Sequence, residues 1–458
     1  MSDCEKRASG FTDVDDNYEN EKGEAEQLNT PINQNKKQKK ISTKFHFDFN
    51  EIICIANILA TALGIGVFTF PYILYKIGVI NSLFVFIFLF LSVYYSLELL
   101  RRFVVDAKLF SYASITQATL GNCWLKIYVI FTFFFYMSTI INYLKIISNL
   151  ATSMMDFLTN KIVKIFYFLI TYVLEVILCL YTSNIGKIHI LSFIGFGTFI
   201  IIFFTVVIKG IYHLSTNDDR FKYFSFFSFK EENNGWNIFL TLMAKIIEFY
   251  YGYIYHSTFP TLLSGLKNLN EENTKRINDT SYIIISVFYF FFSFFGFFCI
   301  NEHNETYTEL FVGENDYDLQ KNTAIICIFK FILILFFVSL IPVRYLVIRD
   351  NYISLIGHDN LPFKFEIIIT LICLFITNTI VYFADYDNLI SNLIIIFGGF
   401  FGVFIGFVLP VINYIAINGK TKCRSIFGYI IAGIFVLIGF FSIFYNFKNM
   451  NKKEEKKE

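Results

Sequence analysis

The sequence predicts an all-helical integral membrane protein of about eleven transmembrane helices, in which two inverted repeats of five, with helices 1 and 6 broken, precede one extra helix. The composition is 55% hydrophobic, 20% aromatic and only 16% charged. Apolar runs of roughly 20 residues, the length that crosses a hydrocarbon core of ~30 Å, recur from residue 51 to residue 446. The first and the sixth of these runs are interrupted by glycine and proline.

The apolar runs also predict where each span begins and ends. Their approximate limits are 51–78, 80–103, 122–152, 163–183, 188–210, 236–263, 280–301, 322–347, 365–384, 389–416 and 425–446. Residues 1–46 are polar, mixed in charge and poor in large apolar side chains, so we expect a disordered tail there. Residues 47–447 then form the transmembrane domain, and residues 448–458 form a short charged C-terminal tail.

The break in the first span is the most informative local feature. Gly64, Gly66 and Pro71 fall within about eight residues and weaken the helix near the middle of the bilayer. Lipid cannot satisfy the backbone groups that such a break frees, so the break must line a cavity or pack within protein. Because the ends of half-helices offer unpaired N–H and C=O groups, this segment is a candidate ligand site.

The sixth span carries the second strong interruption, between Gly252 and Pro260. If spans one to five and six to ten are two repeats, the two broken helices occupy equivalent positions. A repeat of five spans inverts the second copy relative to the first. Paired broken helices in inverted halves are typical of secondary transporters with a binding site near the bilayer midplane. The alternative is that each glycine only lets helices pack closely, as small residues often do in membranes.

Lysine and arginine between the spans predict the orientation, because they concentrate on the cytoplasmic side. Alternate segments carry most of them: Lys36, Lys37, Lys39, Lys40, Lys44, Arg101, Arg102, Lys108, Lys267, Lys275, Arg276, Arg344, Arg349, Lys364, Lys420, Lys422 and Arg424. The opposite set includes the acidic stretch 301–320, which holds a glycosylation sequon at Asn304. We therefore expect a cytoplasmic N-terminus, in a plasma membrane or a vacuolar or lysosome-like membrane.

Composition argues against other classes of protein. The net charge is +1 and no basic domain stands apart from the spans, which argues against a nucleic-acid partner. The six histidines are scattered, so the clustered ligands of a membrane-embedded enzyme are missing. The eight cysteines show no metal-ligand spacing, and we expect neither a metal nor a cofactor. No repeated selectivity-filter sequence indicates a channel.

Several segments resemble the amino acid/auxin permeases, a family within the amino acid, polyamine and organocation transporters. The matching stretches are 57–72 in the first span, 255–260 in the sixth, 341–344 at the end of the eighth, and 398–400 with 408–410 in the tenth. The resemblance implies eleven spans, a cytoplasmic N-terminus and a LeuT-type fold. It also implies amino acid transport by alternating access, with the amino acid as the small-molecule partner and the bilayer as the environment.

The resemblance places the substrate at the two breaks. The N–H groups of Gly64, Ile65 and Gly66 would receive the substrate carboxylate, helped by the positive end of the following half-helix. Carbonyl groups over 250–253 would accept the ammonium group. The expected residues of the sixth span are Tyr250, Tyr251, Gly252, Tyr253 and Tyr255, whose tyrosines would meet the side chain of the substrate.

The coupling ion is predicted from a departure from the family pattern. Sodium-coupled relatives place an asparagine four residues before the first glycine of the break, where this chain has Ala60, although Asn57 is retained. They also use a hydroxyl in span eight, where this chain offers only Ser339 near Pro342. A sodium ion needs several oxygen ligands, so proton coupling or facilitated diffusion is favoured over sodium coupling.

Charged and titratable residues inside spans are costly and often functional. Lys245 and Glu248 lie three residues apart ahead of the second break, and they form either a structural ion pair or a site where Glu248 carries protons. His256 has either a hydrogen-bonding role at a helix end or a gating role. Weaker candidates are Glu98 and Glu175, whereas Lys145 and Lys330 either supply countercharges or extend towards the outer membrane boundary.

An amino acid sensor on the same fold is the alternative function. Such a protein would bind an amino acid and signal through its N-terminal tail. That tail has no apolar stretch with helical periodicity, which favours the transporter.

Overall fold

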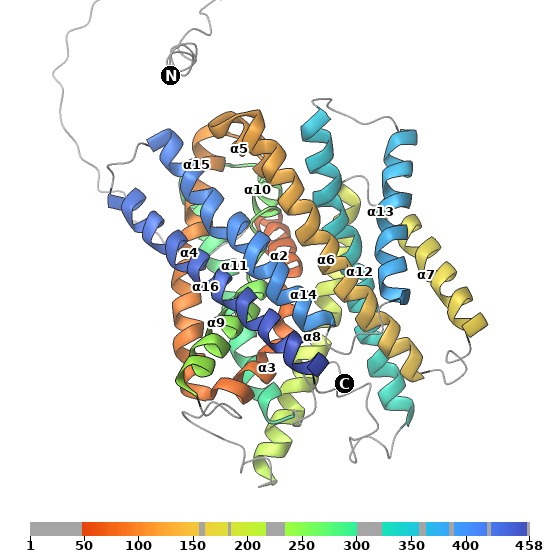
Figure 1. Ribbon diagram of the computed structural model, residues 1–458. Helices are drawn as coiled ribbons and strands as arrows, with labels where there is room; N and C mark the ends of the chain where they lie inside the picture. The colour runs from red at the N-terminus through yellow and green to blue at the C-terminus, as the bar shows by residue number, and fades with distance from the viewer. Residues whose placement is uncertain are drawn as a thin grey trace, which may run out of the picture. The chain divides into compact units, whose positions relative to one another are not determined.

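The computed structural model describes residues 48–154, 161–181, 185–216, 234–299, 323–356, 363–383, 389–418 and 423–455. The tail 1–46, residue 47 and the sequon at Asn304 lie outside these residues. Helices account for nearly all of the described chain (Figure 1). They are α2 (Phe49–Ala62), α3 (Gly66–Ile77), α4 (Val79–Ala107), α5 (Tyr112–Leu120), α6 (Asn122–Met154), α7 (Lys161–Tyr181), α8 (Ile185–Ser215), α9 (Gly235–Gly252), α10 (Phe259–Leu263), α11 (Glu271–Phe297), α12 (Thr323–Ile356), α13 (Phe363–Phe383), α14 (Leu389–Phe397), the π-helical turns η4 (Gly398–Gly402) and η5 (Phe404–Val408), α15 (Leu409–Asn418) and α16 (Cys423–Glu455).

Each predicted span contains helix, and the differences lie at the ends. The helix α11 begins nine residues before the predicted span 280–301, and α12 ends nine residues after 322–347. The helix α16 continues to Glu455, so helix extends into the predicted C-terminal tail. The short α5 was not expected, since it is too short to span a bilayer. Polar helix ends that extend past the hydrocarbon core carry no apolar signal, which explains why the sequence places them in loops.

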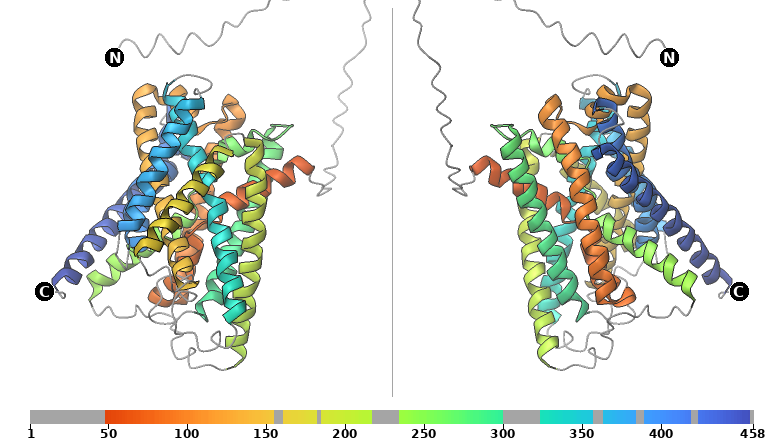
Figure 2. Two further views of the ribbon diagram at one scale, coloured as in Figure 1. Left: turned by 90° about the vertical axis from the view of Figure 1, so that its right-hand side faces the viewer. Right: turned by 90° about the vertical axis from the view of Figure 1, so that its left-hand side faces the viewer.

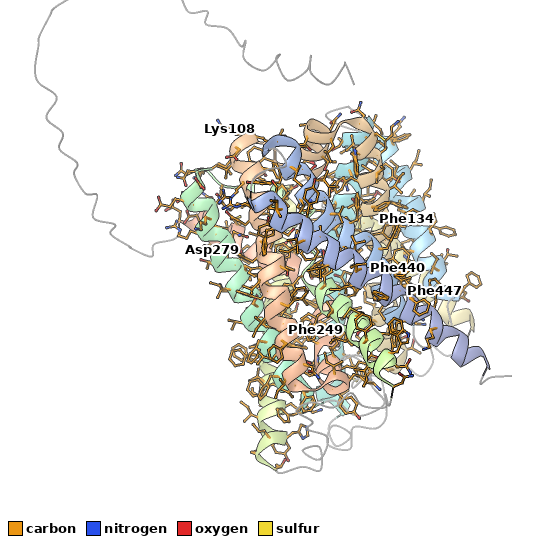
Figure 3. The ribbon with its side chains drawn as sticks, turned by 60° about the vertical axis from the view of Figure 1, so that its left-hand side comes forward. Lys108, Phe134, Phe249, Asp279, Phe440 and Phe447 are labelled. Atoms are coloured by element: carbon orange, nitrogen blue, oxygen red, sulfur yellow. The ribbon has the colours of Figure 1, made fainter. Side chains whose placement is uncertain are left out.

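The described residues include eight helices that are long and apolar enough to cross a membrane, or nine if α2 and α3 count as one bent span. The count of eleven therefore stays a prediction. Large apolar side chains are exposed along the helices, and Figure 3 shows Phe134, Phe440 and Phe447 pointing outward. Exposed apolar side chains in such numbers fit a lipid surface rather than water.

The break between α2 and α3 follows directly from its residues. Asp48 and Glu51 form a capping box that fixes the start of α2. The helix stops at Ala62, and α3 starts at Gly66 with its axis turned by 55°. The N–H of Phe68 bonds to the carbonyl of Ile65, so α3 opens with a tight turn. Both half-helices are largely buried within protein. This burial is expected, because lipid cannot form hydrogen bonds with the backbone groups that the break frees.

The broken helix lies in the middle of the bundle. The half-helix α2 packs against α8 and α11, and α3 packs against α9 and α11. Long helices surround this centre, with α12 against α6 and α8 (Figure 1). In Figure 2 the adjacent helices α9 and α16 run obliquely to the nearly vertical pair α8 and α11. The helices α7 and α13 pack on each other at one side. The two interrupted segments are therefore enclosed by other helices.

A polar cluster joins three helix ends that the charge pattern assigns to one side of the membrane. The Arg276 guanidinium at the start of α11 donates to the Glu51 carboxylate of α2, with N···O distances of 2.6 Å. At the end of α4, Arg101 is fully buried and pairs with Glu98 at 2.7 Å. Arg101 also donates to the hydroxyl of Thr274 at 2.9 Å. These contacts agree with the predicted alternation of the spans.

The tenth predicted span is wound as a π-helix over its glycine-rich part. Turns of this kind leave carbonyl groups without their usual partners, and side chains from other helices take them. Tyr250 donates to the carbonyl of Gly402 at 2.9 Å, and Tyr112 donates to the carbonyl of Ile405 at 2.8 Å. Ser96 of α4 donates to the carbonyl of Gly406. The π-helical segment thus links α4, α5 and α9.

Candidate functional site

The two breaks meet at a pair of glycines. A Cβ atom added to Gly66 would lie 2.5 Å from the Cα atom of Gly252. A Cβ atom added to Gly252 would lie 2.6 Å from the ring of Phe70. Only glycine permits this approach of the two backbones. Gly66 and Gly252 therefore do allow two helices to pack closely, which was the alternative explanation for these glycines. This close packing also brings the two breaks together.

A small cavity lies at this crossing. Its volume is about 10 Å³, which is room for about one water molecule. It is lined by Ala62, Gly64, Ile65, Gly66, Phe135, Thr139, Tyr143, Tyr251, Gly252, Ile254 and Arg344. Five of the eight predicted substrate residues are among them. An amino acid needs more space, so the surrounding side chains or half-helices must move to admit one.

The first break supplies unused backbone donors. Within the described part of the chain, no hydrogen bond uses the N–H of Gly64, Ile65 or Gly66. These three groups stand at the N-terminal end of α3, where the helix dipole favours negative charge. The geometry therefore suits a carboxylate, and buried N–H groups without partners are rare enough to indicate a ligand position.

The second break offers fewer free carbonyls than the sequence suggests. The carbonyls of Tyr250, Tyr251 and Tyr253 each accept a backbone N–H from the following turn. The carbonyl of Gly252 instead lies 2.6 Å from the hydroxyl of Tyr289. The same hydroxyl lies 2.6 Å from the carbonyl of Ala62. One hydroxyl proton serves only one of these two acceptors at a time, so one carbonyl stays available to an ammonium group.

A buried arginine completes the wall of the cavity. Arg344 of α12 is 5% exposed, and its Nη2 donates to the carbonyl of Thr61 at 2.7 Å. Its Nε donates to the hydroxyl of Tyr143 at 3.3 Å. A Cβ atom added to Gly64 would lie 2.9 Å from the Tyr143 hydroxyl and 3.1 Å from Arg344 Nη2. Gly64 therefore faces these two side chains across the cavity.

The predicted tyrosines divide into two groups. Tyr251 lines the cavity, and its hydroxyl lies 2.7 Å from the hydroxyl of Thr139. Tyr250 instead packs on Phe407 and bonds to the tenth predicted span, and Tyr253 packs against Tyr289. Tyr255 is buried beside Phe259. The structure does not bring these last three to the cavity.

Asn57 lies one to two turns before the break and lines a second, polar cavity of about 40 Å³. That cavity shares no lining residue with the first. It is lined by Asn57, Thr61, Ser111, Ser257, Thr258, Thr261, Leu262, Val343, Leu346, Val347, Asp350 and Asn351. Thr61 and Val343 are direct chain neighbours of Ala62 and Arg344, so the two cavities lie close together. Eight of its twelve lining residues have polar side chains.

The other predicted coupling residues lie outside both cavities. The Lys245 ammonium is 2.7 Å from the Glu248 carboxylate, with both side chains buried, and lies 5.1 Å from the centre of the Tyr72 ring. His256 is fully buried, and neither ring nitrogen has a hydrogen-bond partner in the described residues. The ion pair between Lys245 and Glu248 has the geometry of the structural alternative.

The weaker candidates are engaged elsewhere. Glu98 pairs with Arg101, and Glu175 accepts from Asn378 at 2.7 Å. Lys330 donates to the carbonyl of Ser153 at 3.2 Å. The predicted hydroxyl of Ser339 donates to the carbonyl of Phe336 and faces Gly195 of α8.

Sequence reasoning missed six of the eleven residues that line the cavity, and Tyr143 and Arg344 are the two of these whose side chains meet Gly64. It placed Arg344 among the charges that flank a span, whereas the structure buries it inside α12. The misplacement follows from the length of α12, whose 34 residues continue well past the apolar run. A signal was present, because Pro342 and Arg344 belong to a stretch that resembles the permease pattern. Tyr143 carries no signal that separates it from the other 28 tyrosines.

Comparisons with known proteins identify the family and the fold. The family model described as transmembrane amino acid transporter protein matches residues 52–451. A solved structure of the Eremococcus coleocola manganese transporter, in complex with an aromatic bis-isothiourea substituted compound, is 12% identical, with 87% of this chain and 86% of that chain covered and a TM-score of 0.57. A Na⁺-coupled sialic acid symporter in a substrate-bound outward-open state is 14% identical, with coverages of 85% and 88% and a TM-score of 0.50. A comparison with curated proteins gave no match. The two structural likenesses establish a LeuT-type fold.

Proposed function

We propose that this chain, which belongs to the transmembrane amino acid transporter family, is a secondary transporter that carries amino acids across a membrane by alternating access. The observation that carries the proposal is the meeting of the two breaks at one buried cavity with three unused N–H groups. Broken helices that meet in this way are the usual substrate site of such folds.

The backbone recognises the part that all amino acids share. The N–H groups of Gly64, Ile65 and Gly66 bind the carboxylate, and the positive end of α3 adds to this attraction. The ammonium group binds the carbonyl of Gly252 or Ala62, whichever the Tyr289 hydroxyl leaves free. Tyr251 contacts the side chain of the substrate. Of the predicted residues, Tyr250, Tyr253 and Tyr255 support the second break by packing.

Alternating access follows from the jointed construction of the first span. Substrate enters and leaves when α2 or α3 swings at the 55° joint, because the closed cavity of about 10 Å³ holds no amino acid. The polar cavity beside Asn57 lies next to α2 and forms part of one route. The cytoplasmic N-terminus places that route on the cytoplasmic side, in a plasma membrane or a vacuolar or lysosome-like membrane.

Coupling uses a proton or no ion. Ala60 replaces the expected asparagine, and Ser339 already donates to its own helix, which supports a site poor in sodium ligands. The buried pair of Lys245 and Glu248 fixes α9 beside α3, and His256 is available to a gating step.

Uptake into proteoliposomes tests the proposal. The purified chain is reconstituted, a mixed pool of labelled amino acids is added, and proton and sodium gradients are imposed separately. We expect saturable uptake that a proton gradient increases or leaves unchanged and that a sodium gradient does not increase. Saturable binding without flux would overturn the proposal in favour of the sensor, for which the comparisons give no support. Flux driven by sodium alone would overturn the coupling assignment.

A further inference from the structure

The strongest feature that the proposed function leaves unexplained is the charge of Arg344. Its guanidinium is buried at the level of the breaks, and an arginine stays protonated under all ordinary conditions. No ion pair in the described residues includes it. Its neighbours are neutral: the Thr61 carbonyl, the Tyr143 hydroxyl and the ring of Tyr136 at 5.8 Å. A buried positive charge without an anion is costly, so the site favours an anionic group.

One donor of this arginine is unused. Nη2 and Nε are engaged with Thr61 and Tyr143, whereas the buried Nη1 has no hydrogen-bond partner. The guanidinium lines the same cavity as Gly64, Ile65 and Gly66, whose N–H groups are also unused. Four unused donors therefore belong to residues that line this cavity, and none of its lining side chains carries a carboxylate.

We propose that Arg344 binds the carboxylate of the transported amino acid, and that its charge excludes amino acids with basic side chains. This inference rests on the proposed function. A carboxylate has two oxygens and about four acceptor positions, so it accepts both the backbone N–H groups and Nη1. Bonds between a guanidinium and a carboxylate are among the strongest that side chains make.

Charge selection follows from the same lining. The cavity residues carry one positive charge and no negative charge. A neutral zwitterion or an acidic amino acid brings the missing anion, whereas a lysine-like or arginine-like substrate brings a second cation without a carboxylate to receive it. Repulsion between like charges is strong in a buried site. The substrates are therefore neutral or acidic amino acids.

The test compares each accepted amino acid with its amide, which lacks the carboxylate. Competition for labelled uptake in proteoliposomes gives the ratio of the two inhibition constants, for the unchanged protein and for Arg344→Gln. We expect the acid to bind better than the amide by about 100-fold in the unchanged protein, and this preference to fall by at least about tenfold in Arg344→Gln. Arg344→Lys should restore part of the preference because it restores the charge. Basic amino acids should compete poorly.

The ratio of the two inhibition constants does not depend on how much of the protein is folded. If Arg344→Gln no longer transports, the shift in thermal unfolding that the acid and its amide each cause gives the ratio of their binding constants instead. Arg349→Gln is the matched control, since Arg349 lies on the same helix but pairs with Asp350 at 3.0 Å and Glu366 at 3.3 Å. If the ratio in Arg344→Gln equals that of the unchanged protein, Arg344 has a structural role and the inference is overturned. If the ratio is unchanged and uptake also requires chloride, Arg344 binds an inorganic anion instead, and the inference is again overturned. If the unchanged protein transports no amino acid, the proposed function itself fails.

Discussion

At the scale of single residues, the glycines at the breaks have different tasks. Gly64 faces the ends of two side chains, Tyr143 and Arg344, across the cavity. Gly66 faces the backbone of Gly252. A side chain at position 64 therefore fills the cavity that we propose as the substrate site, whereas a side chain at position 66 forces two backbones apart. Substitutions at position 64 should therefore mainly reduce transport, whereas substitutions at position 66 should mainly reduce stability.

Gly64→Val should abolish uptake without abolishing membrane insertion. The valine side chain occupies the space of the substrate carboxylate and displaces Arg344, and misplacement of about 1 Å costs roughly 100-fold in rate. The measurement is initial uptake normalised to protein in the vesicles. Gly433→Val is the matched control, because a Cβ atom there meets nothing within 4 Å. Normal uptake by Gly64→Val would remove the central site assignment.

Gly66→Ala should lower stability more than Gly64→Ala. Its Cβ atom would lie 2.5 Å from the Cα atom of Gly252, and backbone yields less readily than the ends of side chains. Overpacking of this kind costs about 1–3 kcal/mol. Thermal unfolding of the two variants in detergent gives the comparison. Equal midpoints for both variants would show that the two breaks do not meet at Gly66.

The sequence predicted those cavity residues that would bind a ligand through their backbone groups but, apart from Tyr251, not those that would bind it through a side chain. Gly64 and Gly66 were found because glycine in an apolar span is a strong local signal. Arg344 was not, because an arginine near the end of an apolar run has the same pattern whether it flanks a membrane or is buried. Only the packing of α12 against α6 separates the two cases.

At the scale of elements, the ion pair in α9 connects the second break to the rest of the bundle. Lys245 and Glu248 are buried on one face of the helix, and Lys245 lies over Tyr72 of α3. The pair lies outside the substrate cavity. Its geometry is that of a structural contact between α9 and α3.

Glu248→Gln should therefore destabilise the protein strongly, because Lys245 loses the carboxylate beside it. Breaking a buried pair costs roughly 3–5 kcal/mol, whereas replacing both partners by apolar groups is often neutral. The double variant Lys245→Met, Glu248→Met should recover most of the stability and keep any uptake driven by protons. Thermal midpoints and proton-driven uptake of the three proteins are measured together. A stable double variant that has lost only its response to protons would make Glu248 the proton carrier.

Element boundaries show where sequence reasoning succeeds. Each predicted apolar run contains helix, and the glycine and proline signals coincide with both interruptions. The predicted end of the sixth span at residue 263 coincides with the end of α10. The polar extension of α11 contacts other helix ends, because Arg101 of α4 donates to Thr274 and Arg276 donates to Glu51 of α2. Periodicity does not report such contacts.

At the scale of the whole molecule, the chain combines a LeuT-type fold with membership of an amino acid transporter family. The fold was predictable because membrane spans and paired breaks are local in sequence. The chemistry of the substrate was not, because it depends on which side chains of distant helices converge. Alternating access, which we propose for this chain, is the property that distinguishes a transporter from a channel and from a sensor.

Counterflow in proteoliposomes measures that property directly. Vesicles loaded with an unlabelled amino acid are diluted into a trace of the same labelled compound, with no ion gradient imposed. We expect the label to accumulate transiently above equilibrium in the unchanged protein and not in Gly64→Val, because a carrier exchanges one substrate for another through one site. Saturable binding without accumulation would contradict transport, and a rise to equilibrium without overshoot would contradict alternating access.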